Sequence, residues 1–157
     1  MYHKKTLTKW KWFLGSGVII IVLALTSVLF YVRQHERRLM GYARSLENLP
    51  EIQEVVSIRE SSGTASYIVA RVMRVDGEEF IYFVADDVVV EQVAATKLLS
   101  AEAAANGIFG TYEIVSSTLS RYQNRIVYEL VANTALGVNY VLVDAMTGDS
   151  ILSFVID

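Results

Sequence analysis

The first pattern along the chain is an uncharged, mainly apolar run near its amino end. It covers the 21 residues from Trp12 to Val32. As a helix with a rise of ~1.5 Å per residue this run would be ~31 Å long, which matches the ~30 Å hydrocarbon core of a bilayer. A cleaved signal peptide usually has a shorter apolar core, ~7–15 residues, followed by small residues. Because this run leads directly into Arg33, the pattern favours a retained transmembrane anchor over 12–32.

The charges on both sides of the run bear on its orientation. Four lysines precede it and four arginines follow it up to Arg44, so the positive-inside rule gives a tie. A short lysine block without acids beside a free amino terminus usually stays in the cytoplasm. We therefore expect a cytoplasmic basic tail over 1–11, a single-pass anchor in the cell membrane, and extracytoplasmic residues after position 32.

After the anchor, apolar positions recur with helical spacing. Leu39, Ala43 and Leu46 lie on one helical face, with Leu49 beside them, and Pro50 ends the pattern. No Gly/Ser-rich linker separates this segment from the anchor. The membrane helix is therefore predicted to continue into a domain helix without a flexible stalk.

From position 54 the pattern changes to the alternation that is typical of strands, interrupted by turn residues. Asp76-Gly77 predicts a hairpin, because both positions can adopt a positive φ, and Ser61-Ser62-Gly63 and Asp86-Asp87 predict further turns. A second helix is expected at Ala101–Phe109. The predicted strands are Glu54–Glu60, Ala65–Val75, Glu79–Val84, Val88–Val93, Tyr112–Leu119, Arg125–Ala132, Val138–Asp144 and Ser150–Ile156.

The order helix, antiparallel strands, helix, antiparallel strands indicates an α+β fold with two similar halves, 33–94 and 95–157. Below ~70–80 residues one core rarely supplies enough stability, so the halves are expected to pack together. Val88-Val89-Val90 and Val141-Leu142-Val143 are apolar at successive positions. We expect these two runs to be covered on both faces of their strands.

Composition narrows the chemistry. The chain has no cysteine, and its two histidines are His3 and His35, so the predicted strands carry no thiol or imidazole for catalysis or metal binding. From Glu47 onward 16 acids stand against six bases, a formal difference of −10, and such a domain is repelled by phosphate. We expect no enzyme activity, no cofactor, no metal and no nucleic-acid partner.

Several polar residues have both a structural and a functional interpretation. Ser100, three residues after Lys97, could form a serine–lysine pair, but the N-cap of the alanine-rich helix that follows is a better fit. Asp144 and Asp149 could be metal ligands, but Thr147-Gly148 between two apolar runs is typical of a tight turn. We interpret all of them as structural.

Tyrosine is the residue type best suited to a contact surface here, because its large ring carries a polar tip. Strand alternation is expected to bury most of the tyrosines after the anchor. Tyr122, in the turn from Arg121 to Arg125, is the one we expect to be exposed, and it is a weak candidate for protein binding.

Segments in a fixed order carry a family resemblance over nearly the whole chain. They are the lone anchor, Ala65–Val69, Glu79–Val84, Leu99–Ala104, Val127–Leu130 and Tyr140–Gly148. In that order they resemble the TseB (YpmB-type) proteins of Gram-positive bacteria. The last segment, in which two residues separate Asp144 from Thr147-Gly148, is similar to the closing hairpin of PepSY domains.

The resemblance implies two tandem PepSY-like (cystatin-like) domains outside the membrane. It implies that they regulate cell wall elongation by binding a class B penicillin-binding protein, which is a membrane-anchored peptidoglycan transpeptidase. A PepSY-type peptidase inhibitor or sensor ectodomain is the alternative. Two further hypotheses stay open. One is a purely structural tether, and the other is a glycan hydrolase that uses only carboxylates, which needs two facing acids ~5–5.5 Å apart for retention or ~6.5–9.5 Å apart for inversion.

Overall fold

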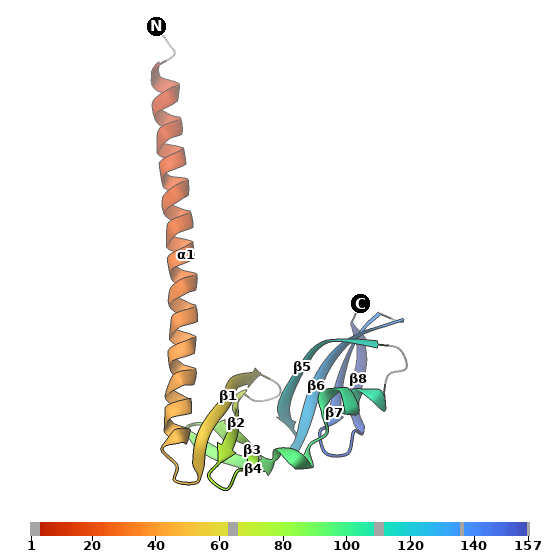
Figure 1. The fold of residues 1–157 in the computed structure, drawn as a ribbon. Coiled ribbons are helices and arrows are strands. Elements are labelled where there is room, and N and C mark those ends of the chain that lie inside the picture. The colour runs from red at the N-terminus through yellow and green to blue at the C-terminus, as the bar shows by residue number, and fades with distance from the viewer. Residues whose placement is uncertain (1–3, 63–65, 109–111, 136, 157) are drawn as a thin grey trace. The chain divides into compact units, whose positions relative to one another are not determined.

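The computed structural model describes residues 4–62, 66–108, 112–135 and 137–156. The chain forms two compact units, residues 1–40 and Gly41–Asp157. Helix α1 (Lys4–Glu47) forms the described part of the first unit, and its last residues belong to the second unit, which also holds every described strand (Figure 1).

Helix α1 is continuous, so the predicted anchor and the predicted domain helix are one helix, which ends at Glu47 and not at Leu49. Its stretch Val18–Glu47 contains a window with a mean hydropathy of 1.8 and is, by length and composition, able to cross a membrane. The large apolar side chains between Val18 and Val32 are 45–71% exposed, which suits contact with lipid.

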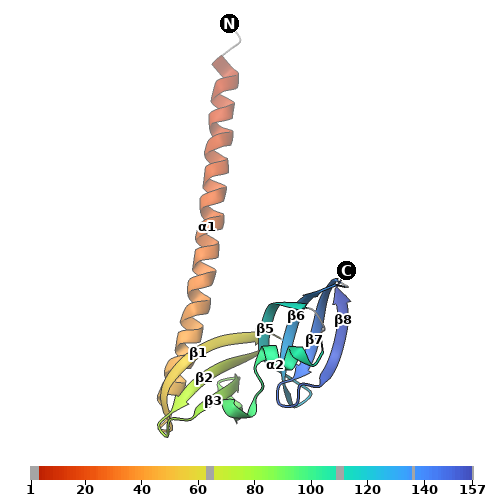
Figure 2. The same ribbon diagram turned by 45° about the vertical axis from the view of Figure 1, so that its right-hand side comes forward.

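The first sheet is an antiparallel meander in the order β1-β2-β3-β4. Its strands are labelled in Figure 1, and Figure 2 shows β1, β2 and β3 from another side. Its strands are β1 (Ile52–Ser62), β2 (Ser66–Arg74), β3 (Glu79–Ala85) and β4 (Val88–Ala94). The prediction of a turn at Ser61 and Ser62 is wrong, because both residues pair with β2 at the end of β1. Gly63 and Ala65 lie outside the described residues.

The predicted hairpin at Asp76-Gly77 is confirmed, because this turn joins the antiparallel strands β2 and β3. Only Gly77 has a positive φ, 84°. Arg74 N–H donates to Glu78 O and Gly77 N–H donates to Arg74 O, which closes a three-residue loop, and Asp76 Oδ1 accepts a hydrogen bond from Glu78 N–H. Two-residue turns with two positive φ values occur instead at Asp86-Asp87 and Gln123-Asn124.

A 3-10 turn (η1, Ala95–Lys97) and helix α2 (Ala101–Asn106) precede the second sheet. Its order is β5-β6-β7-β8, with strands β5 (Tyr112–Tyr122), β6 (Arg125–Thr134), β7 (Gly137–Asp144) and β8 (Ser150–Ile156). The predicted helix over Ala101–Phe109 is too long, since α2 ends before Gly107, and Phe109 lies outside the described residues.

Two apolar clusters stabilise the second unit. One contains Val69, Ile81, Phe83 and Val93 from the first sheet together with Ile126 and Ala145 from the second half. The other joins Ala104 and Ala105 of α2 to Leu130, Val141 and Val143. The prediction of an α+β fold in which two helix-plus-sheet halves pack together is therefore confirmed, while the boundaries at 33, 94 and 95 stay predictions.

The two apolar runs expected to be covered on both faces have different outcomes. Val141-Leu142-Val143 are buried in central strand β7. For Val88-Val89-Val90 the prediction is wrong, because they are 60%, 37% and 44% exposed. The physical reason is that β4 is the last strand of its sheet and, among the described residues, pairs only with β3.

Candidate binding surface beside the edge strand of the first sheet

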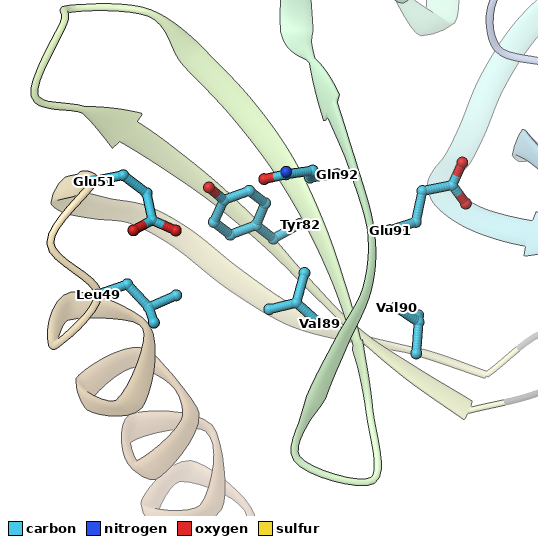
Figure 3. Close-up of a pocket in the computed structure, with 7 residues that line it drawn as sticks. All are labelled: Leu49, Glu51, Tyr82, Val89, Val90, Glu91 and Gln92. Carbon is cyan, nitrogen blue, oxygen red and sulfur yellow. The ribbon is translucent and has the colours of Figure 1, made fainter.

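A groove lies next to β4. Its volume is about 440 Å³, and it is lined by Leu49, Glu51, Tyr82, Val89, Val90, Glu91 and Gln92. Figure 3 shows Leu49 and Glu51 on one side, Val89 and Gln92 on the other, and the ring of Tyr82 between them. A volume in this range is typical of pockets that accept a ligand or a few side chains.

Sequence position explains how the groove forms. Helix α1 ends at Glu47, and the turn that follows carries Leu49 and Glu51 into β1. Tyr82 pairs with Gln92 across the β3–β4 ladder, so their side chains are on one face of the sheet. The groove therefore combines one irregular wall with one wall formed by an edge strand.

Tyr82 is held in place by Arg74. The guanidinium of Arg74 donates to Tyr82 Oη at 2.8 and 3.1 Å and to Gln92 Oε1 at 2.5 Å, and it stacks 3.7 Å from the centre of the Phe80 ring. Tyr82 itself is only 1% exposed. The positive charge of Arg74 is thus already engaged, and the base of the groove is rigid.

Glu91 connects β4 to the second sheet. Its carboxylate lies 2.6 Å from Arg121 Nε of β5, and the Arg121 guanidinium lies 5.5 Å from the centre of the Tyr67 ring. The Glu91 side chain is 30% exposed and the Arg121 side chain is 17% exposed, so both are largely shielded from water. This contact fixes β4 from one face, while its other face borders the groove.

The sequence-predicted residues Asp144, Thr147 and Gly148 form a turn. Asp144 Oδ1 accepts hydrogen bonds from the N–H groups of Met146 and Thr147 at 2.9 and 3.1 Å, and Thr147 Oγ1 donates to Asp149 Oδ2. Gly148 has φ +80°, and a Cβ there would lie 3.3 Å from Leu99 Cδ1. The carboxylate oxygens thus stabilise the backbone, as the turn interpretation requires.

Ser100 is the N-cap of α2. Its hydroxyl accepts a hydrogen bond from Ala103 N–H at 3.1 Å. The preceding residue, Leu99, donates its N–H to Ala145 O and accepts from Tyr128 Oη. The interpretation of Ser100 as a cap, and not as the partner of Lys97, is therefore supported, and the start of α2 is fixed on the second sheet.

The tyrosines are less buried than the alternation predicts. Of those in the described strands, Tyr82 is buried, while Tyr67, Tyr112, Tyr122, Tyr128 and Tyr140 are half-buried. The prediction that Tyr122 is exposed is wrong, because Tyr122 is half-buried at the end of β5, where its hydroxyl accepts a hydrogen bond from Gln123. It lies apart from the groove-lining residues, and its role as a contact residue stays a prediction.

Two tyrosines have perturbed acidities. Burial raises the pKa of Tyr128, with Arg71 opposing and Glu102 adding to the increase. Burial, the charge of Glu129 and the hydrogen bond from Tyr140 Oη to Glu129 raise the pKa of Tyr140 to about 12. Both phenols therefore stay protonated near neutral pH and act as hydrogen-bond donors.

The groove contains little that could perform catalysis. It is lined by two carboxylates, and that of Glu91 is paired with Arg121, whereas hydrolysis of a glycan by carboxylates needs two acids facing the substrate. Within the described residues no group of three or more His, Cys, Asp or Glu could hold a metal ion. The arrangement of apolar walls and one edge strand suits binding of a chain segment.

Sequence reasoning missed this surface. It placed Leu49 on a helix and Val88–Val90 in a covered strand, and neither local pattern shows which strand will be at an edge. The sequence did contain one useful signal for this surface, the turn at Asp86-Asp87, which indicates where β4 begins.

Comparisons with known proteins agree with the fold. No protein-family model and no curated protein matches the chain. Among solved structures, the YpmB protein from Bacillus subtilis matches with a TM-score of 0.62 and 16% sequence identity, over 74% of this chain and 96% of that chain. At this identity the likeness concerns the fold alone. The chain therefore has a YpmB-like fold that follows a helix able to cross a membrane.

Proposed function

We propose that this protein is a single-pass, membrane-anchored binding protein whose extracytoplasmic part regulates cell wall elongation by contacting a class B penicillin-binding protein. The observation that carries the proposal is the YpmB-like pair of sheets that follows a membrane-length helix. It agrees with the resemblance to TseB (YpmB-type) proteins along the sequence, which implies this role.

Physical considerations support a binding role over a catalytic one. The groove offers apolar walls and a rigid base, and the Asp144 and Ser100 side chains are occupied in structural hydrogen bonds. An anchor confines the protein and any other anchored protein to the same thin layer, which raises their effective concentration. Even a weak contact would then be occupied.

The proposal is tested by crosslinking in cells. A photo-crosslinking residue is placed in the full-length chain at Tyr122, at Val88 of β4 and at Val155 of β8, one position at a time, and captured proteins are identified by mass spectrometry. We expect a penicillin-binding transpeptidase from at least one position. Capture of a peptidase alone would support the inhibitor or sensor alternative. If no position captured either a transpeptidase or a peptidase, the proposal would be contradicted.

The membrane part is tested separately. Fractionation should recover the full-length chain, beginning at the basic tail, in the membrane, and protease added outside the cell should degrade the residues after α1. A mature form in the medium that starts within the apolar run would show that the run is a cleaved signal peptide. An intact second unit after protease treatment would reverse the proposed orientation.

A further inference from the structure

The outer edge of β4 is open to another strand. In the described residues β4 pairs with β3 alone, and it is the last strand in the sheet order. Natural edges are commonly protected by lysine or proline, and Val88–Ala94 contains neither. Three consecutive valines are exposed here. The bulge near Val90 is the single irregularity in this ladder.

The groove makes this edge different from an ordinary exposed strand. A segment added beside β4 places alternate side chains on the face that carries Val89, Gln92 and the groove. The groove volume of about 440 Å³ accommodates small or medium apolar side chains. Leu49 and Val89 supply apolar contacts on its two sides (Figure 3).

The charges around the edge of β4 determine which sign of charge a bound segment should carry. Glu51 is exposed on the groove wall, and Asp86 and Asp87 are exposed in the turn directly before β4. None of the described residues that line the groove is a lysine or an arginine, and Arg74 behind them is bound to Tyr82 and Gln92. This environment is complementary to a basic segment and unfavourable to an acidic one.

The strand β8 provides a comparison within the same molecule. It too is an edge with exposed apolar residues, Leu152, Phe154 and Val155. However, the Phe154 ring stacks on Tyr140 with 4.9 Å between centroids, so the largest of these side chains already has a partner. The edge of β8 therefore serves as a matched control for β4.

We infer that β4 and the groove beside it bind an extended segment of the partner, which adds as a fifth strand to the first sheet and carries small apolar residues flanked by lysine or arginine. This inference rests on the proposed function and specifies the surface and the chemistry of the contact. Backbone hydrogen bonds supply affinity, the groove selects side-chain size, and Glu51, Asp86 and Asp87 select charge.

The first test uses defined peptides and the full-length protein in detergent micelles. The probes are two labelled peptides of about ten residues, with alternating valine and threonine and with either lysine or glutamate at both ends. Fluorescence anisotropy should show the lysine peptide binding at least about tenfold more tightly than the glutamate peptide, because like charges at an interface cost several kcal/mol. Equal affinities, or no binding of the lysine peptide, would overturn the inference.

The second test locates the binding site. Val89→Lys introduces a positive charge beside the groove at a position where an exposed edge tolerates lysine, and it should weaken binding of the lysine peptide about tenfold or more. The control Val155→Lys on β8, at a similarly exposed valine, should change it less than about twofold. An equal loss in both variants would contradict a site at β4.

Hydrogen exchange on the unmodified protein makes the result independent of variant folding. Binding of the lysine peptide should slow exchange of amides in Val88–Ala94 and leave those in Ser150–Ile156 unchanged. Protection of β8 alone, or concentration-dependent dimers that protect β4 without peptide, would overturn the inference, the latter in favour of a second copy of this chain as the occupant.

The crosslinking in cells separates this inference from the proposed function. Capture of the transpeptidase from Val88 and not from Val155 supports both. Capture from Tyr122 or Val155 alone supports the proposed function and overturns the site at β4. Peptide binding at β4 without transpeptidase capture from any position supports the site and contradicts the proposed function.

Discussion

The packing of the two sheets through one apolar cluster predicts that they unfold together. Ile126 belongs to the second half but lies in the cluster formed mainly by Val69, Ile81 and Phe83 of the first sheet, and it is 4% exposed. Ile126→Ala removes buried methylene and methyl groups and leaves a cavity, which costs ~2–5 kcal/mol. We take ~3 kcal/mol as the expected loss in the free energy of unfolding.

The size of the cooperative unit determines the change in Tm. With an unfolding entropy of ~2.1 cal/mol/K per residue, a unit the size of Gly41–Asp157 has a total unfolding entropy of ~0.25 kcal/mol/K. A loss of ~3 kcal/mol in the free energy of unfolding then lowers Tm by ~12 °C. If each half unfolded alone, the entropy would be half as large, and the second half would lose ~24 °C.

Hydrogen exchange with mass spectrometry distinguishes these cases in the full-length chain. In Ile126→Ala, the slowest amides of β2, β3, β6 and β7 should all lose protection together by ~100-fold, which corresponds to ~3 kcal/mol. The control Leu152→Ala, at an exposed side chain of β8, should change protection little. Unchanged protection in β2 and β3, or two separate thermal transitions, would refute a single cooperative unit.

Further predictions concern the Arg121–Glu91 ion pair, the turn at Gly148, the hydroxyl of Tyr140 and the salt dependence of peptide binding. Arg121→Ala leaves Glu91 shielded and unpaired, and it should lower the free energy of unfolding in a denaturant titration by ~1–3 kcal/mol. The control Arg71→Ala removes the more exposed pair with Glu79 and should lower the same free energy by less than ~1 kcal/mol. Gly148→Ala should cost ~1–2 kcal/mol because of its positive φ and the nearby Leu99, while Gly107→Ala, which meets no atom within 4 Å, should cost nothing in thermal unfolding. The pKa of Tyr140 is raised to about 12, above the value near 10 in the unfolded chain, so its contribution to stability is complete below pH ~10 and lost as pH rises toward 12; Tyr140→Phe should flatten that decline in unfolding titrations. Association of the lysine peptide should slow by at least several-fold between ~0.05 and ~0.5 M salt in stopped-flow measurements, because screening weakens attraction to the acidic domain, and a salt-independent rate would contradict electrostatic steering.

The sequence predicts local features better than it predicts neighbours in space. The apolar run, the start of α2 at Ser100 and the Asp144 turn depend on contacts a few residues apart, so their residues could be interpreted directly. The exposure of Val88–Val90 depends on β4 being last in its sheet. No alternation pattern contains that information, because a covered strand and an edge strand with a groove can have the same apolar residues.

The groove could not be predicted from the sequence either, because its walls come from residues that lie far apart in the chain. Leu49 and Val89 are 40 positions apart in the chain, and they face each other only because α1 ends at Glu47 and the sheet returns its last strand beside that end. The prediction that most tyrosines after the anchor are buried holds for Tyr82. Its contact with Arg74, which fixes the base of the groove, required the β2–β3 register.

An exposed apolar edge is a risk for a protein, since the same edge of another copy can pair with it. The charge of the domain limits that risk here. With an excess of ten acids from Glu47 onward, two copies repel each other, and the acids Glu51, Asp86 and Asp87 concentrate that repulsion beside β4. The same field attracts a basic strand. The charges that protect the edge from self-association are therefore the charges that make it selective, and this explains how the strand can lack both lysine and proline and still remain available to a partner.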